Sequence, residues 1–377
     1  MLLLTFEGLS PASLSCYGAS WNRTESIDAI AADGVAFDRV IVNHTDPLRQ
    51  VSAWLRKPGF IADRCTLVTD DERFADIDGI DRVGELVLLP VRAGGVADSI
   101  EGTSLAALAA VAAEQIAMDE HVWLHSRFLT RCWDAPRNLF PIEHLDNEDD
   151  GPLDESETIE EEIAHAERPT VETARVPSIL DVWQPPAVTL SQKDDPDWIM
   201  AWMRTYGCQV RLIDEIVGLL TDMAAEHHRG GIAVAGTSGF ALGQNQAIGH
   251  QQGPLRSCHL HVPFLIQRFD LATSDCTGIR NRQVIGLDRL GSIIDDEHHF
   301  DAINGPTQWA SPAKEDSILT YHDDRPVAIN TDQWFYVDED HDGKIGKLFL
   351  KPDDASDVND VARLRSETSE ELAARLA

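Results

Sequence analysis

Basic residues are scarce in this chain. It has 31 lysines and arginines against 64 aspartates and glutamates, which gives a formal net charge of −33. A surface of this sign repels nucleic acids and anionic membranes, so we expect neither as a partner. The acidic residues are best explained as a solvated, solubilising surface. An anionic substrate such as a sulfate ester would need a local basic pocket.

Paired cysteines and long apolar runs are also missing. The six cysteines are scattered and include no Cys-x-x-Cys pair, which favours reduced thiols over a disulfide framework. No apolar run approaches the ~20 residues of a membrane span. Residues 1–4 are too short for the apolar part of a secretory signal and have no basic residue ahead of them. We therefore predict a cytoplasmic protein without membrane association.

The rest of the chain has the pattern of an α/β protein. Its 377 residues, 43% of them hydrophobic, allow one large or two modest domains. Short apolar runs at residues 2–6 and 231–235 read as buried strands, and Thr103–Met118 and Asp197–Glu226 as helices. Short strands after residue 316 predict a small antiparallel sheet that ends in a helix capped by Ser369. We place an α/β domain at residues 1–300 and an α+β subdomain at 301–377.

An acidic run interrupts the first domain at about residues 146–167. Like charges at this density repel one another, so we interpret the run as a solvated insertion and not as a metal site. A second acidic stretch, Asp338–Gly343, resembles the start of an EF-hand loop. Its twelfth position is Phe349 instead of Glu, and a hairpin turn is the better interpretation.

The first 56 residues contain the most informative pattern. The strand at residues 2–6 delivers the carboxylate of Glu7 to its end. A helix from Ser26 follows and ends at Gly34, where we expect a left-handed C-terminal cap. A strand from Asp38 to Asn43 then leads into the segment Thr45-Asp46-Pro47-Leu48-Arg49.

This order resembles the sulfatases of the alkaline phosphatase superfamily, which share the strand, the acidic metal ligand, Cys-Tyr-Gly, the helix ending in Gly, and Cys/Ser-x-Pro-Ser-Arg. Later segments extend the resemblance over almost the whole chain. The glycines at 239, 243 and 249 align with the family's Ser-Asp-His-Gly segment, and residues 262–266 align with its Val-Pro-Leu-Ile-Ile strand. The resemblance implies an alkaline-phosphatase-like sulfatase fold, with a mixed, mostly parallel sheet flanked by helices and a small C-terminal antiparallel sheet plus helix.

The catalytic positions of that family carry different residues here. Thr45 stands where the family has the Cys or Ser that becomes formylglycine, and threonine cannot be converted to it. Glu7 is the one acid at a metal-ligand position, since Gly8 and the pair Thr237-Ser238 replace the others. The family binds Ca²⁺ or Mg²⁺, which need several oxygen ligands, so we predict no bound metal and no cofactor. No base for Thr45 is evident in the sequence.

Other polar residues have both a functional and a structural interpretation. Asp70-Asp71 could be a metal pair, but acids that end a strand more often cap a turn or a helix. His125 and Arg131, near the family's substrate loop, could contact an anion, although a histidine at a strand end is usually a structural hydrogen-bonder. His259 and His261 are expected on one face of a strand, again as structural residues rather than zinc ligands.

Three functions follow from these observations. The first is a non-catalytic sulfatase homologue, a pseudoenzyme that binds a small anion or a sulfated or phosphorylated ligand in the cleft where the family has its active site. The ligand would be held by Arg49, by Arg131 and by His250, which stands where the family has its anion-binding Lys. The second is a sulfuric or phosphoric ester hydrolase with a non-standard site of Thr45, Arg49 and His250. The third is a scaffold or dimer partner of an active sulfatase, and homo-oligomerisation stays open.

Two structural predictions accompany them. The strands at 2–6 and 231–235 should be parallel neighbours, with Glu7, Thr45 and Thr237 converging at their C-terminal edge, where open α/β sheets place ligands. Arg49 has two interpretations of equal weight. It holds an anion in a forked geometry, or it ties loops together through backbone carbonyls or a carboxylate such as Glu7.

Overall fold

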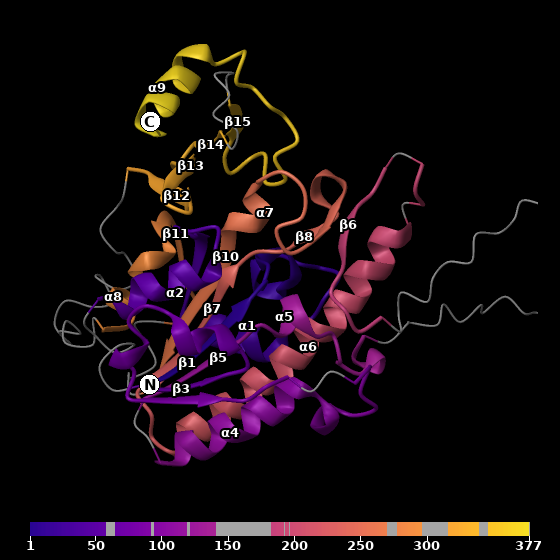
Figure 1. Ribbon diagram of the computed structural model, residues 1–377, viewed down its shortest axis with the longest axis vertical. Coiled ribbons are helices and arrows are strands. Elements are labelled where there is room, and N and C mark those ends of the chain that lie inside the picture. The colour runs from indigo at the N-terminus through magenta and orange to yellow at the C-terminus, as the bar shows by residue number, and fades with distance from the viewer. Residues whose placement is uncertain are drawn as a thin grey trace, which may run out of the picture.

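A computed structural model describes residues 1–57, 65–91, 94–118, 121–140, 182–191, 193–195, 197–269, 277–295, 316–338 and 346–376. The strands of its main sheet are β1 (Leu2–Glu7), β2 (Val35–Ile41), β3 (Thr66–Thr69), β4 (Glu85–Leu88), β5 (Val122–Ser126), β7 (Gly231–Ser238), β10 (His261–Arg268) and β11 (Ile279–Gly286). They lie in the order β11-β2-β10-β7-β1-β5-β3-β4 (Figure 1). The sheet is mixed and mostly parallel, because only β10 runs antiparallel to its neighbours.

Strand β1 lies in the middle of this sheet, between β5 and β7, and is parallel to both. Every residue of β1 is buried, as a central strand covered on both faces requires. Its side chains alternate between two hydrophobic cores. Leu2, Leu4 and Phe6 pack into one core, and Leu3 packs into the other. The predicted parallel pairing of residues 2–6 with 231–235 is confirmed.

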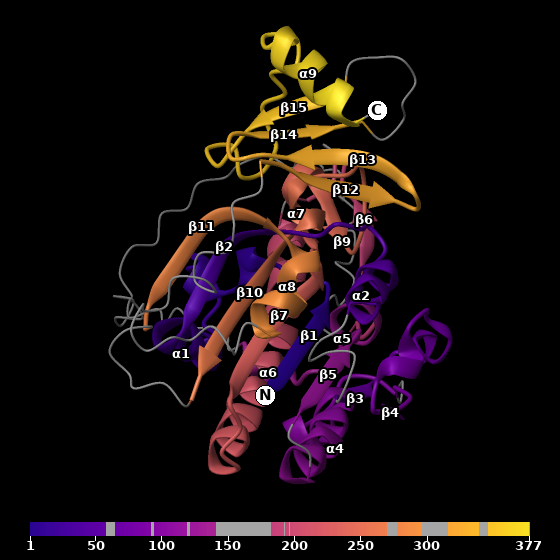
Figure 2. The same cartoon turned by 90° about the vertical axis from the view of Figure 1, so that its left-hand side faces the viewer.

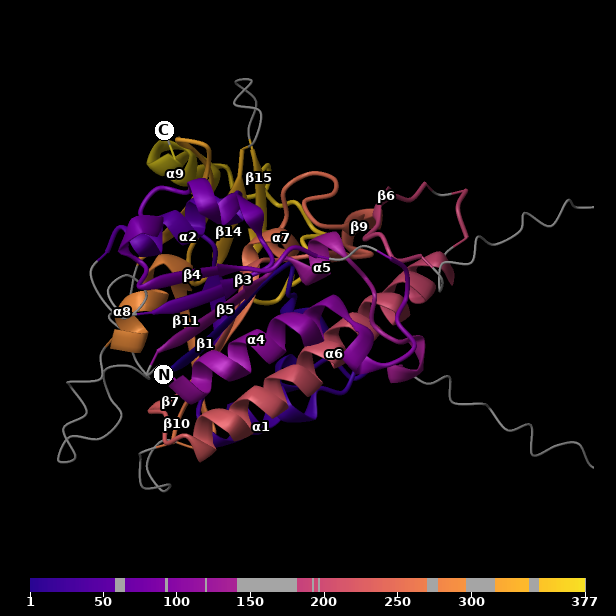
Figure 3. The ribbon, with the colours of Figure 1, turned by 60° about the horizontal axis from the view of Figure 1, so that its bottom comes forward.

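Helices cover both faces of the sheet. The described helices of the whole chain are α1 (Glu25–Asp33), α2 (Pro47–Leu55), α4 (Ser104–Met118), α5 (Phe128–Arg131), α6 (Asp197–Glu226), α7 (Ser257–Leu260), α8 (Leu290–Asp295) and α9 (Ser366–Leu376). Helices α1, α4 and α6 cover one face, and α2 and α8 lie on the other (Figure 3). The predicted helix bounds of α6 are confirmed, and its apolar face packs into the core of the first group.

The C-terminal part forms a layer of its own beyond one end of the main sheet (Figure 2). Strands β12 (Ile318–His322), β13 (Arg325–Asn330), β14 (Trp334–Val337) and β15 (Lys347–Leu350) form a four-stranded antiparallel sheet with α9 packed against it. This confirms the predicted small sheet and helix. The prediction that Ser369 caps this helix was wrong. Helix α9 begins at Ser366, and the Ser369 hydroxyl donates to the Ala362 carbonyl oxygen.

A third, small sheet contains β6 (Ala187–Thr189), β8 (Ala241–Leu242) and β9 (Ala247–Gly249). The acidic insertion, the 300/301 boundary and most of the EF-like stretch lie outside the described residues, although β14 and β15 pair as a hairpin would require. Within the described ranges, no helix combines the length and the apolar character that a membrane span needs.

Three local predictions were wrong. Strand β2 begins at Val35 instead of Asp38. Gly34 is not left-handed, since its φ is −144°. A Cβ at Gly34 would lie 2.2 Å from the carbonyl oxygen of Ile266, so a close approach of β10 requires the glycine there. His259 and His261 do not share a strand face, because His259 lies in α7 and β10 starts at His261.

Candidate functional site

The candidate site lies where the central parallel strands end. Glu7 is the last residue of β1, Ser238 of β7 and Ser126 of β5, and Asp70 and Asp71 follow directly after β3. Because these strands are parallel neighbours, their C-terminal ends meet at one edge of the sheet. This edge is where open α/β sheets bind ligands.

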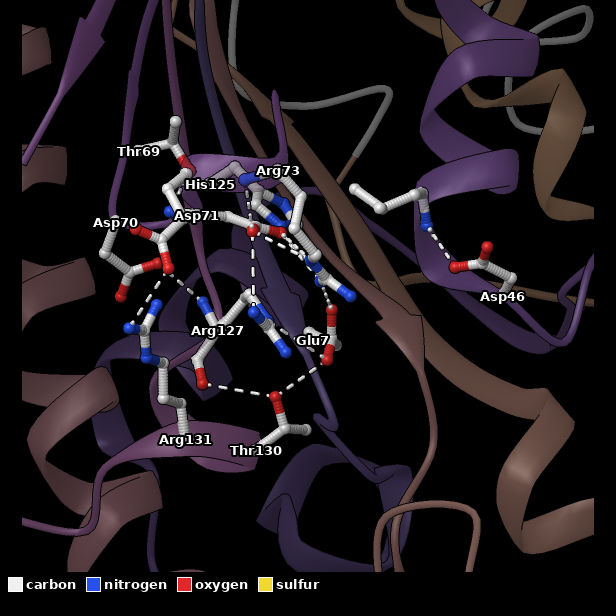
Figure 4. Close-up of polar contacts among 12 residues, drawn as sticks. Glu7, Asp46, Thr69, Asp70, Asp71, Arg73, His125, Arg127, Thr130 and Arg131 are labelled. Atoms are coloured by element: carbon white, nitrogen blue, oxygen red, sulfur yellow. Dashed lines mark hydrogen bonds and ion pairs between the residues drawn. The ribbon is translucent and has the colours of Figure 1, made fainter. Parts of the chain in front are cut away.

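Glu7 is buried, and its carboxylate is surrounded by donors (Figure 4). One guanidinium nitrogen of Arg73 lies 2.7 Å from Oε2, and the Thr130 hydroxyl donates to Oε1 over 2.8 Å. Nε of Arg127 is 3.6 Å from Oε1. Burial alone would raise the pKa of Glu7, but a protonated His250 and the two guanidinium groups lower it, and the result is about 2. Glu7 is therefore ionised at neutral pH.

Asp71 completes this cluster and is fully buried. Arg73 binds Asp71 in a forked geometry. Its Nε lies 2.8 Å from Oδ1 and 3.0 Å from Oδ2 of Asp71, and one terminal nitrogen lies 2.7 Å from Oδ2. The same terminal nitrogen contacts Glu7, so one guanidinium bridges both carboxylates. Asp71 also accepts from the backbone N–H of Arg73 and caps the short 3-10 helix Glu72–Asp76. The capping prediction is confirmed, and the residue has a second role in the cluster.

Asp70 takes no part in the bridge. Its carboxylate accepts from the Ser126 hydroxyl over 2.7 Å and from the backbone N–H of Arg127 over 2.8 Å. Burial raises its pKa to about 6, although both hydrogen bonds act in the opposite direction. Asp70 thus fixes the start of the segment that carries Arg127.

His125 lies beneath the cluster as a structural residue. Its Nδ1 is 2.9 Å from the Thr5 hydroxyl, which also accepts from the Trp123 indole, and its ring packs against Phe74. Burial lowers the pKa of His125 to about 4, so the ring is neutral at pH 7. These contacts agree with the structural interpretation of this histidine.

The donor set does not fit a Ca²⁺ or Mg²⁺ ion. Ligand atoms of Glu7, Asp71 and His125 lie within 4.8 Å of one another, which is the spacing of a metal site. However, these cations require oxygen ligands, and His125 offers a nitrogen. The guanidinium of Arg73 already binds both carboxylates.

Two of the family's other ligand positions, Gly8 and Ser238, are hydrogen-bonded to each other, whereas the buried hydroxyl of Thr237 has no hydrogen-bond partner among the described residues. The backbone N–H of Gly8 donates to both the carbonyl and the hydroxyl oxygen of Ser238, at 3.1 Å and 3.0 Å. The same hydroxyl is 2.9 Å from Nε2 of His250, whose pKa is lowered by burial. Gly8 has a φ of +86°, and a Cβ there would lie 2.7 Å from Thr130, so an acidic side chain would not fit.

Thr45 belongs to a different set of contacts. Its hydroxyl is 2.9 Å from Nδ1 of His322, and its backbone N–H donates to the carbonyl oxygen of Tyr321. The expectation that Thr45 has no base nearby was therefore wrong. Asp46, its neighbour, lies apart from the Glu7 cluster in Figure 4. The convergence of Thr45 with Glu7 and Thr237 stays a prediction.

Arg49 and Arg131 both pair with carboxylates. Arg49 lies 2.9 Å from Asp324 and 3.3 Å from Asp323, in the turn between β12 and β13. These contacts agree with the interpretation that Arg49 ties loops together. Its partners are the two aspartates of this turn instead of Glu7. Arg131 is 3.4 Å from Glu72.

A cavity of about 300 Å³ opens beside Thr45. Its lining includes His259, which is buried, and Gln251. Nδ1 of His259 accepts from the backbone N–H of Arg256, so the ring's other nitrogen, Nε2, carries the hydrogen. Burial lowers the pKa of His259 to about 4, which keeps the ring neutral.

Sequence reasoning missed Arg73, Arg127, Thr130 and His322. One signal was available, since Arg127 directly follows a predicted central strand and its side chain could be expected at the ligand edge. His322 had no signal, because 277 residues separate it from Thr45.

Comparison with known proteins identifies the fold. No family model and no curated protein matches this sequence. Among solved structures, the chain is similar to BT4656, solved in complex with its substrate D-glucosamine-2-N,6-O-disulfate, with a TM-score of 0.67, 13% identity, and 100% of this chain and 96% of that one covered. The chain has the alkaline-phosphatase-like sulfatase fold.

Two further structures agree with this fold. The phosphonate monoester hydrolase of Agrobacterium radiobacter gives a TM-score of 0.61 at 15% identity, over 99% of this chain and 94% of that one. BT1596, a 2-O GAG sulfatase, gives a TM-score of 0.58 at 10% identity, with 100% of this chain and 89% of that one covered. The predicted sulfatase-like fold is confirmed.

Proposed function

We propose that this protein binds a sulfated or phosphorylated ligand at the C-terminal edge of its sheet, without a metal ion and without hydrolysing the ligand. One observation carries the proposal. The Arg73 guanidinium contacts the carboxylates of Glu7 and Asp71 at 2.7 Å each, at the position where a sulfatase would hold its cation.

The charges of the cluster argue against a divalent cation there. The carboxylates of Glu7 and Asp71 oppose the guanidinium groups of Arg73 and Arg127, so the four charges cancel. A divalent ion would bring two positive charges into this neutral group, or it would have to displace a guanidinium from a buried ion pair. Removing one partner of a buried pair costs about 3–5 kcal/mol. Both routes make metal binding unfavourable.

Arg127 is the residue best suited to receive an anion. Its ion pairs with Glu7 and Asp71 are long, at 3.6 Å and 3.5 Å, and its side chain is 21% exposed. A guanidinium that is held by long ion pairs and is partly accessible can bind a sulfate or phosphate oxygen in a forked geometry. His250 adds positive charge only when protonated, and because its pKa is lowered, this gain comes below pH 6.5. A solved structure of similar fold holds a sulfated sugar, which supports this class of ligand.

Calorimetry with inorganic sulfate, inorganic phosphate and glucosamine disulfate tests the proposal. We expect binding that strengthens as the pH falls below 6.5, that weakens about tenfold or more in Arg127→Gln, and that is unchanged by EDTA. Arg56→Gln is the matched control, because it removes an exposed guanidinium that pairs with Asp78. Stoichiometric Ca²⁺ or Mg²⁺ in the purified protein, lost in Glu7→Gln, would overturn the proposal.

The contact between Thr45 and His322 favours a second candidate, a metal-free ester hydrolase. At 2.9 Å, Nδ1 of His322 can accept the Thr45 proton while Oγ1 forms a bond to the sulfur or phosphorus of an ester. The ester oxygen leaves as that bond forms, and it takes the proton from His322. Water then hydrolyses the Thr45 ester. The neutral N–H of His259 could donate to an oxygen of the transferring group in the adjoining cavity.

Turnover assays separate the two candidates. The substrates are p-nitrophenyl sulfate and p-nitrophenyl phosphate, assayed with EDTA present. The non-catalytic function predicts no enzymatic release of p-nitrophenol. Release that is lost in both Thr45→Ala and His322→Gln would establish the hydrolase instead. Thr189→Ala serves as a control, since Thr189 lies on β6, outside the cavity lining.

A further inference from the structure

A second cavity, of about 450 Å³, lies between the main sheet and the C-terminal sheet. It is separate from the cavity at Thr45, with which it shares no lining residue. Its lining comes from β2, α7, the start of β10, β11, the end of β13 and the segment after β15. The lining residues are Asp38, Arg39, Ile41, Ser257, His261, Arg282, Asn330, Lys351, Pro352 and Ala355.

The charge of this cavity is opposite to that of the whole chain. Among its described lining residues, Arg39, Arg282 and Lys351 are cationic and only Asp38 is acidic. Asp38 pairs with Arg280, and its other oxygen lies 3.9 Å from Nε of Arg282, so one carboxylate is shared by two guanidinium groups and the lining keeps a net positive charge. A concentration of positive charge in a protein with a net charge of −33 is a local feature that an anion would recognise.

Arg39 is held in place by two backbone carbonyls. Its two terminal nitrogens donate to the carbonyl oxygens of Asp332 and Thr331, at 2.8 Å and 3.0 Å. These bonds fix the direction of the guanidinium, and the charge of Asp332 also acts on it. Lys351 differs, because its ammonium pairs with Asp357. Arg39 therefore supplies a fixed positive charge at the cavity.

Asn330 supplies an independent sign of a ligand. The residue is 4% exposed, and Nδ2 of its amide has no hydrogen-bond partner. Leaving a buried donor unpaired costs about 1–3 kcal/mol. An acceptor atom of a ligand in the cavity would remove this cost. Ile41, Pro352 and Ala355 add apolar surface, which suits a ligand with a small apolar body.

We propose that this cavity binds a small organic anion, with its phosphate or carboxylate group between Arg39 and Arg282 and an acceptor atom on the amide of Asn330. This site is independent of the function proposed for the Glu7 cluster. Sequence reasoning did not find this site, because its lining residues are up to 317 positions apart, from Asp38 to Ala355.

Calorimetry on the full chain tests the proposal with phenyl phosphate, benzoate and inorganic phosphate as probes. We expect phenyl phosphate to bind more tightly than inorganic phosphate, because only the former uses the apolar surface. Asn330→Asp keeps the shape of the side chain but gives it a negative charge, so it should weaken phenyl phosphate binding at least tenfold. Arg282→Gln, at a mostly exposed side chain, should weaken it about threefold.

Two controls locate the binding. Arg363→Gln removes an exposed arginine outside the cavity lining and should leave the affinity unchanged. The cavity variants are also measured in an Arg127→Gln background, which removes the anion binding proposed at the Glu7 cluster, so that any remaining loss of affinity reports on this cavity. If Asn330→Asp does not fold, Arg282→Glu replaces it, with an expected loss of at least tenfold. The absence of phenyl phosphate binding at millimolar concentration, or an affinity indifferent to both cavity variants, would overturn the proposal.

Discussion

Replacing Glu7 with glutamine removes one charge from the buried cluster and changes almost nothing in shape. In the native protein this carboxylate accepts from Arg73 and Thr130. The glutamine oxygen can keep one of these bonds, but its amide group then faces a guanidinium. Arg73 and Arg127 would be left with Asp71 as their one carboxylate in the cluster. We expect Glu7→Gln to destabilise the fold through this uncompensated positive charge.

The lowered pKa of Glu7 sets the size of the effect. A shift from 4.5 to about 2 corresponds to about 3 kcal/mol of preference for the ionised side chain in the folded protein. A carboxyl whose folded pKa is lowered stabilises the protein above its unfolded pKa and loses that contribution as the pH falls through the folded value. The difference between wild type and Glu7→Gln should therefore be about 3 kcal/mol at pH 7 and shrink between pH 4.5 and 2.

Urea unfolding at pH 7, 5, 4 and 3 measures this difference. Comparing the two proteins at each pH removes the contribution of the titrating groups that do not interact with Glu7, because both proteins contain those groups unchanged. The charge of Glu7 raises the pKa of His250 and of His125, so these two groups contribute to the difference. Glu85→Gln is the matched control, since Glu85 lies exposed on β4 and should give a difference within about 0.5 kcal/mol. A Glu7→Gln protein as stable as wild type at pH 7, or equally destabilised at pH 7 and pH 3, would refute the role of the charge cluster.

Three further predictions concern the fold and the metal. Gly34→Ala should cost about 3 kcal/mol or more in urea unfolding, because its Cβ would meet backbone at 2.2 Å, whereas Gly94→Ala has open space and should be neutral. Burial raises the pKa of Asp214 to about 6, so wild type should gain about 1–2 kcal/mol over Asp214→Asn as the pH falls from 7 to 4; a constant difference would contradict this. Excess Ca²⁺ or EDTA should leave the melting temperature unchanged, whereas a metal at 100 times its Kd would add about 2.7 kcal/mol.

Local features of this protein were determined by the sequence. The apolar run at residues 2–6 had to be buried on both faces, and it is the central strand. The helix at Asp197–Glu226 has the predicted bounds because its apolar residues repeat at helical spacing. The order of strands, glycines and helices was enough to indicate the sulfatase fold. These features depend on residues that are close together in the chain. Over such short distances, the spacing of buried residues and the backbone preference of each residue type determine the local structure directly.

Tertiary structure decided the contents of the site. Glu7 meets Arg73 and Thr130 across 66 and 123 residues of chain, and Thr45 meets His322 across 277. Such contacts depend on which strands are neighbours, on their register, and on where each loop returns to the sheet edge. A motif can mark Glu7 as a metal ligand, but the partner of its charge is the nearest cation in space. The fold brings a guanidinium to that place, because a carboxylate buried this deeply requires a positive charge beside it.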